Sequence, residues 1–185
     1  MSRVTSPPTE SVDPQVLRAQ AEQALRDGRV AEVVPLLEKL VHVAPDGSDV
    51  ALFAHRNLAE LQLQADPWAA ALHLRRVVTK SPQDHVAHAL MCLCHALLGN
   101  LRFAVGSYRR AVALQPKNPW YNHNLGHLLD VALGKSAEGR SYLERAQQAK
   151  PDEDEISSSL GHCLARCGEL KPALKLLQRA VRMRP

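Results

Sequence analysis

The chain of 185 residues carries 23 lysines and arginines against 19 acidic residues, and 45% of it is hydrophobic while only 4% is aromatic. Its net charge of +4 is weakly basic, and acidic residues interleave with the basic ones, so we expect no continuous basic face for nucleic acid. Strand-like alternation, a signal-peptide core and a run long enough to span a bilayer are all missing from the sequence. We therefore expect an all-α, cytoplasmic protein without membrane insertion.

Residues 1–13 form the first segment of the chain. Their sequence, MSRVTSPPTESVD, has two prolines, several hydroxyl residues and no apolar run, which predicts a disordered tail. Asp13 followed by Pro14 is a favoured start for a helix. Residues 14–185 are predicted to form a single domain.

Prolines divide this domain at nearly regular intervals. Pro82, Pro116, Pro151 and Pro185 lie 34, 35 and 34 residues apart, and Pro45 precedes Pro82 by 37. A period of this length indicates repeated helical hairpins. In chain order, the predicted units are residues 14–47, 50–84, 85–118, 119–153 and 154–185.

Each unit contains two helical patterns separated by a turn. The third unit shows this most clearly, because Val86, Leu90, Leu93 and Leu97 recur at spacings of three and four before the turn at Gly99. The other turns are predicted at Asp27-Gly28, Asp66-Pro67, Leu133-Gly134 and Cys167-Gly168.

With these features the sequence resembles a tetratricopeptide repeat array, in which small residues occupy the helix crossings. The resemblance places these small residues at Ala21, Ala59, Cys92, Gly126 and Gly161 in the first helices, and at Ala71, Ala104, Gly139 and Ala173 in the second helices, where Val33 departs from the pattern. It implies a right-handed α-solenoid, or superhelix, of about five helix-turn-helix hairpins. Such a fold buries each hairpin against its neighbours.

The resemblance also implies a concave groove lined by the first helices. The residues that it predicts on this surface are, in chain order, Arg18, Glu22, Arg56, Asn57, Glu60, Val86, Ala89, Leu90, Leu93, Leu97, Trp120, His123, Asn124, His127, Asp130, Ser158, Ser159, His162 and Arg166. The first helix of the third unit is apolar nearly all round, and an open apolar patch is typical of a binding site. We therefore expect a noncatalytic interaction module, an adaptor or scaffold, that holds an apolar helical or extended segment of a protein partner, with Leu90, Leu93, Leu97 and Trp120 as anchors. The alternative is that superhelical winding or the tail covers these side chains.

The last predicted helix, KPALKLLQRAVRMR, carries an apolar stripe of Ala173, Leu176, Leu177, Ala180 and Val181. Either its own hairpin uses this stripe, or the stripe mediates self-association through Leu177 and Val181 into a homo-oligomeric scaffold. A third alternative is that the chain is an accessory domain of a larger enzyme.

Nine histidines and four cysteines raise the question of a metal site. His123 and His127 are four residues apart on one helix face, a spacing that can hold zinc, but core packing explains the cysteines better. No phosphate-binding loop or nucleophile elbow is present. The sequence thus predicts no metal, no cofactor and no enzymatic activity.

Overall fold

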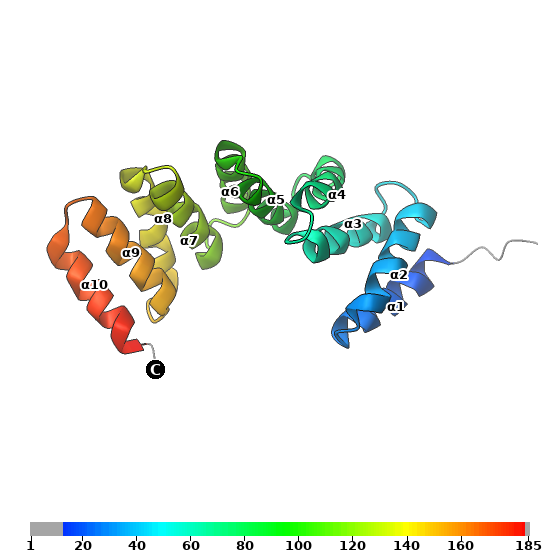
Figure 1. Ribbon diagram of the computed structural model, residues 1–185, viewed down its shortest axis with the longest axis horizontal. Coiled ribbons are helices and arrows are strands. Elements are labelled where there is room, and N and C mark those ends of the chain that lie inside the picture. Colours follow the sequence, from blue (N-terminus) through cyan, green and yellow to red (C-terminus); the bar gives the residue numbers. More distant parts are fainter. Residues whose placement is uncertain (1–12, 184–185) are drawn as a thin grey trace, which may run out of the picture.

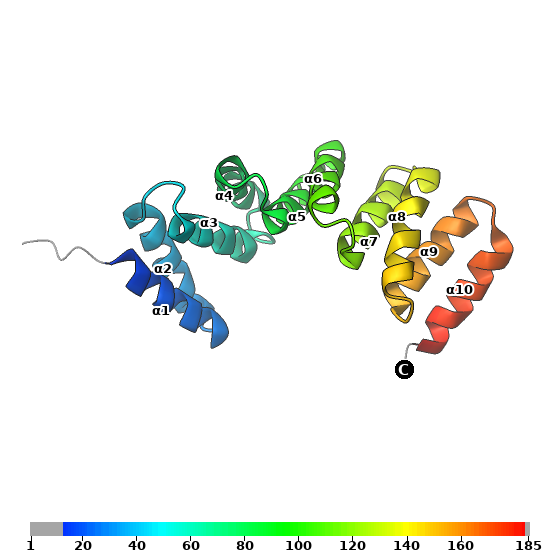
Figure 2. The same ribbon diagram turned by 180° about the vertical axis from the view of Figure 1, so that it is seen from behind.

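The computed structural model describes residues 13–183. Over this range the chain forms ten α-helices and one π-helical turn, which follow one another along an arc (Figures 1 and 2). The elements are α1 (Pro14–Arg26), α2 (Val30–Val43), α3 (Asp49–Gln62), α4 (Pro67–Lys80), α5 (His85–Leu97), α6 (Leu101–Leu114), α7 (Pro119–His127), η1 (Leu128–Ala132), α8 (Ser136–Ala149), α9 (Asp154–Arg166) and α10 (Leu170–Met183). The predicted all-α solenoid is confirmed, whereas the predicted disordered tail falls almost entirely on residues outside the described range.

Local sequence signals account for where the helices begin. The side chain of Asp13 accepts a hydrogen bond from the Gln15 amide, with Pro14 as the first helical residue. Asp66 and Asn118 cap α4 and α7 in the same way, again with a proline first. These caps satisfy backbone N–H groups that a helix start leaves without partners.

Neighbouring helices pair as hairpins, α1 with α2 and so on to α9 with α10, and each second helix then packs against the first helix of the next hairpin. In Figure 1, α4 and α6 lie on the outer side of the arc. From this pairing of helices we propose that the boundaries between the repeat units are those predicted from the sequence. Each helix of the described chain is too short or too polar to span a lipid bilayer.

The small residues predicted at the crossings of the first helices are all buried. In the second helices the prediction is right at Ala104, Gly139 and Ala173, but wrong at Ala71. Ala70 is fully buried there, while Ala71 is only partly buried at the edge of the cluster. Ala70 precedes Pro82 by twelve residues, as Ala104 precedes Pro116, so the closing proline gives the correct register.

The π-helical turn explains why the fourth unit is longer than the third. The nine residues of α7 continue directly into the five of η1, whereas α5 and α9 each have 13 residues. The widened turn absorbs the extra residue between Pro116 and Pro151 and shifts the side chains that follow it. π-turns of this kind are frequent at functional sites.

Candidate functional site

A pocket of about 290 Å³ lies between α5 and the α7–η1 segment. We call it the apolar pocket, and its lining residues are Cys92, Leu93, Ala96, Tyr108, Asn124, His127, Leu128, Val131 and Ala132. Leu93 and Val131 line it while remaining 38% and 56% exposed. The predicted centre of the groove at Leu93 is therefore an open apolar surface of the described chain.

One hydrogen bond joins two polar residues that line this pocket. The Asn124 amide nitrogen lies 2.9 Å from the hydroxyl oxygen of Tyr108, to which it donates. Tyr108 is buried, and burial raises the pKa of its phenol to about 12. The bond crosses from α7 to α6 and fixes both side chains, so the pocket is preformed around a neutral polar pair.

A second pocket, of about 450 Å³, lies between α7–η1 and α9. We call it the polar pocket, and it is lined by His127, Val131, Glu155, Ser158, Ser159, His162 and Arg166. Four residues predicted on the concave surface line this pocket, namely Ser158, Ser159, His162 and Arg166. His127 and Val131 line both pockets, so an apolar surface continues directly into one rich in hydrogen-bonding groups.

Asp130 and Arg166 hold the two helices beside the polar pocket. The guanidinium of Arg166 contacts both carboxylate oxygens of Asp130, with Nε 2.8 Å from Oδ1, and the Ser136 hydroxyl donates to the same Oδ1 at 2.6 Å. Burial alone would raise the pKa of Asp130, but the hydrogen bonds from Arg166 and Ser136 outweigh it and lower the pKa below its usual value. Asp130 is only 2% exposed, so it supports the surface rather than lining it as predicted.

His123, predicted to line the groove, is instead buried. Its ring bonds to the Ser159 hydroxyl at 2.9 Å and to the Asn124 side chain at 3.1 Å, and burial lowers its pKa. It therefore acts as a neutral tie between α7 and α9. His127 is exposed, with its ring centroid 6.0 Å from that of His123.

The other residues predicted for the centre of the groove lie around the apolar pocket rather than in it. Val86 and Leu97 are exposed on α5 but line neither pocket. Leu90 is partly buried against the cluster that includes Ala59 and Leu74, so its place is mainly in the core between units. The ring of Trp120 is half-buried under the Lys150 ammonium, 4.9 Å from its centroid.

Arg56 and Asn57 are not brought to these pockets. Arg56 lines a separate cleft with Arg18 and Phe53, and its guanidinium lies 3.0 Å from the Asp84 carboxylate. The Asn57 amide donates to the Phe53 carbonyl oxygen of its own helix at 2.8 Å. Arg56 thus contacts the residue that caps α5, while Asn57 bonds within α3.

Sequence reasoning missed Val131, Leu128 and Ala132 in the pocket wall. Val131 is four residues after His127, and this spacing was a usable signal, because residues four apart share a helix face. Leu128 and Ala132 belong to the π-turn itself. The one sequence signal of that turn was the 35-residue spacing between Pro116 and Pro151.

Cys92, Cys94 and Cys163 are poor nucleophiles. Burial raises the pKa of the thiols of Cys92 and Cys163 to about 12 and that of Cys94 to about 11. The Cys163 thiol donates to the Ser136 carbonyl oxygen. Within residues 13–183, no three His, Cys, Asp or Glu side chains are grouped so that they could hold a metal ion.

Comparisons with known proteins agree with this architecture. The tetratricopeptide repeat family model matches residues 121–153. No curated protein gives a significant sequence match. Among solved structures, a crystal structure of MamA is 16% identical with a TM-score of 0.77 and covers 88% of this chain and 93% of that one.

Two further MamA structures superpose as well. A fragment from Desulfovibrio magneticus RS-1, residue 41 to the end, has a TM-score of 0.80 at 16% identity, covering 92% of this chain and 94% of that one. A MamA RS-1 double mutant has a TM-score of 0.81 at 16% identity, covering 92% and 93%. The family match places a tetratricopeptide repeat at residues 121–153, and the three MamA structures share the helical solenoid fold of this chain.

Proposed function

We propose that the chain is a noncatalytic protein-interaction module that binds an amphipathic segment of a partner across α5, α7–η1 and α9. The observation that carries the proposal is the continuity of the two pockets at His127 and Val131. An apolar side chain of the partner fits the apolar pocket, while polar groups of the same segment face Ser158 and His162. Tetratricopeptide repeats are protein-interaction units, and recognition of a segment in a groove buries its apolar anchors.

The volume of the apolar pocket limits how many side chains of the partner it can hold. At about 290 Å³ it lies at the lower end of small-molecule sites, where roughly 300–1,000 Å³ is usual. Its opening at Leu93 and Val131 leaves room for a backbone to pass outside. One or two aliphatic or aromatic side chains on a helical or extended segment match this shape.

A display library of random 16-residue peptides tests the proposal, with selection on the wild-type chain and counter-selection on Leu93→Glu. The variant places a carboxylate in the apolar pocket, and because Leu93 is 38% exposed its stability should change by less than about 1 kcal/mol. We expect enriched peptides with an apolar face that bind the wild type only. Peptides that bind both proteins equally would show that the apolar pocket is not the site.

The ion pairs on the second helices argue for protein rather than nucleic acid as the partner. Arg109 of α6 pairs with Glu138, and Arg179 of α10 pairs with Asp152 at 2.7 Å. These acids reduce the positive field that a phosphate backbone requires. A cytoplasmic location belongs to the same proposal, and cell fractionation tests it.

Self-assembly through α10 is the alternative to groove binding, although every charged residue of that helix is basic and would repel its counterpart in a second copy. Of the two residues in the self-association hypothesis, Val181 is 72% exposed, whereas Leu177 is half-buried and packs against Gly161. Ala173 and Ala180 are buried in the hairpin, as in the alternative in which the hairpin uses its own stripe, while Leu170 and Leu174, outside that stripe, are exposed. Light scattering over a concentration series, with Val181→Glu as the variant, separates this candidate from groove binding.

A further inference from the structure

Helix α10 presents an apolar stripe that its own hairpin does not use. Leu170, Leu174 and Val181 are 67%, 58% and 72% exposed, and they lie at spacings of four and seven on one face. Within the described chain, α10 packs mainly against α9. An exposed apolar stripe of this kind is typical of a protein contact surface.

The equivalent face of the inner second helices α2, α4 and α6 is apolar and receives another helix, whereas α8 carries Arg140 and Gln147 at these places. Counted back from the closing prolines, Leu174 and Val181 correspond to Val34 and Val41 of α2, Ala71 and Val78 of α4, and Val105 and Val112 of α6. All six of these residues are buried or partly buried in clusters that include residues of the following first helix. Leu174 and Val181 therefore have the position and chemistry of a helix-packing face, whereas Val30, the equivalent of Leu170 in α2, is 52% exposed.

The opposite end of the array has a polar outer face. Gln20 and Gln23 of α1 are exposed, and they occupy the places where the inner first helices carry packed residues. Counted from the small crossing residues, those packed residues are Leu58, Met91, Leu125 and Leu160 for Gln20, and Leu61, Cys94, Leu128 and Cys163 for Gln23. A head-to-tail contact between two copies would press these glutamines onto the apolar stripe and strip them of water, which is unfavourable.

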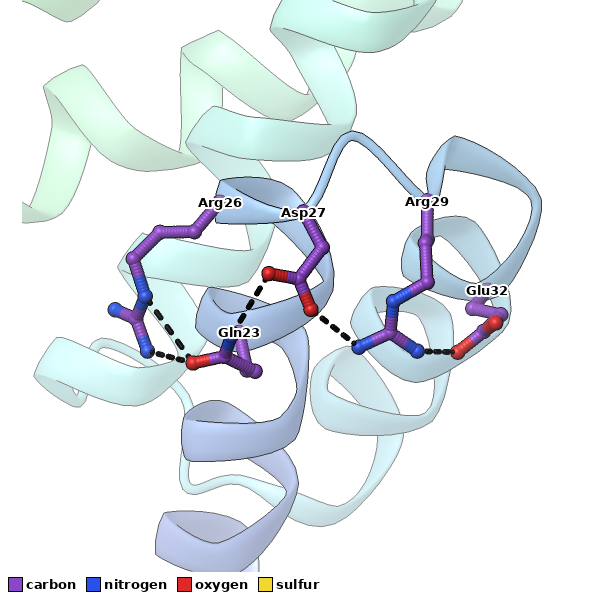
Figure 3. Close-up of polar contacts among 5 residues, drawn as sticks. All are labelled: Gln23, Arg26, Asp27, Arg29 and Glu32. Carbon is purple, nitrogen blue, oxygen red and sulfur yellow. Dashed lines mark hydrogen bonds and ion pairs between the residues drawn. The ribbon is translucent and has the colours of Figure 1, made fainter.

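A hydrogen-bonded network reinforces this polar end (Figure 3). The Gln23 amide donates to Asp27 at 2.8 Å and its oxygen accepts from Arg26 at 2.7 Å. Arg29 contacts both Asp27 and Glu32, which ties α1 to α2 across the turn. The two ends of the array thus differ, since the N-terminal end is suited to water and the C-terminal end to a further helix.

The charged residues of α10 indicate which kind of helix would pack on it. Every charged residue of α10 is basic, namely Lys171, Lys175, Arg179 and Arg182. Two copies of α10 packed together would bring these like charges close, which is destabilising. Joints inside the array instead pair a base of one unit with an acid of the next, as Arg140 does with Glu169.

We propose that the exposed stripe of α10 is a docking surface for an acidic amphipathic helix of a partner protein. The partner helix packs on Leu174 and Val181 as the first helix of a following unit would, and its carboxylates face Lys171 and Lys175. An anionic bilayer also attracts a basic amphipathic helix. The correspondence with a helix-receiving face inside the array favours a helix instead.

Two synthetic 18-residue peptides test this proposal by fluorescence anisotropy. Both carry leucines at helical spacings of three and four, one with glutamate and the other with lysine at all remaining outer positions. We expect the glutamate peptide to bind the full chain and the lysine peptide not to bind. Leu174→Glu should weaken binding by roughly tenfold or more, because it removes a buried leucine contact and adds a like charge.

Val16→Glu on α1 is the matched control, since Val16 is 52% exposed at the other end of the array. It should leave binding unchanged, and so should Leu93→Glu in the apolar pocket, so that this test is independent of the proposed function. Equal binding of both peptides, or binding that survives Leu174→Glu, would overturn the proposal. It would equally be overturned by dimerisation in light scattering that Val181→Glu abolishes, or by binding to phosphatidylserine vesicles without binding to the glutamate peptide.

Discussion

Gly126 of α7 and Gly139 of α8 cross with their backbones in near contact. A Cβ added to Gly139 would lie 2.6 Å from the Gly126 carbonyl oxygen, and a Cβ added to Gly126 would lie 2.8 Å from the Gly139 carbonyl oxygen. The only side chain small enough for this crossing is hydrogen. The crossing holds the α7–η1 segment on α8 and so helps to position the residues that both pockets share.

Gly139→Ala should destabilise the fold by roughly 1–3 kcal/mol, because the added methyl group meets backbone atoms that cannot move aside cheaply. Gly106→Ala in α6 is the control, since nothing lies within 4 Å of its added Cβ. It should stabilise the helix by up to about 1 kcal/mol. Urea denaturation of both variants measures the difference, and equal effects would contradict the close crossing.

Much of the fold could be predicted from the sequence because the repeat proline and the crossing residues act locally. The error at Ala71 arose in a run of three alanines, Ala69 to Ala71, in which only the distance to Pro82 identifies the buried one. Which groove residues are exposed depends instead on packing between units. His123 has the spacing of a groove residue, but its contact with Ser159 of the next unit buries it, and no pattern within one helix reports that contact.

Asp130 should make the fold sensitive to acid. Its pKa is lowered in the native state, so the stability that its pair with Arg166 contributes is present above the unfolded pKa near 3.8 and is lost as pH falls through the native value. Asp130→Asn should lower the free energy of unfolding at neutral pH by roughly 1–3 kcal/mol.

The variant should also unfold less steeply than the wild type as pH drops below about 4, because it no longer gains a proton there. Denaturation curves taken across this pH range supply the comparison. Glu144→Gln, which removes an exposed carboxylate paired with Arg140, is the control. If both variants behave like the wild type, the Asp130 carboxylate does not carry the acid sensitivity.

His55 should make the stability of the fold depend on pH in a higher pH range than Asp130 does. Its Nδ1 lies 2.8 Å from that of His73, and burial together with the positive charge of His73 lowers its pKa to about 4. The unfolded chain takes up this proton near pH 6.5 and the native chain does not. Stability should therefore decrease as pH falls from about 6.5 to about 4, by at most roughly 3 kcal/mol.

Removal of the imidazole in His55→Gln should flatten this part of the pH profile. His42→Gln is the control, because His42 is exposed on α2. Urea unfolding at several pH values within that window provides the measurement. A profile as steep in His55→Gln as in the wild type would assign the decrease to other groups.

The central claim is that a partner segment lies across α5, α7–η1 and α9, and amide hydrogen exchange with and without a display-selected peptide tests it most directly. Bound peptide should slow exchange in peptic fragments covering residues 89–97, 124–132 and 155–166, and leave α2 and α4 unchanged. Leu93→Glu should abolish this protection. Protection confined to the outer helices or to α10, with none along residues 124–132, would contradict the claim.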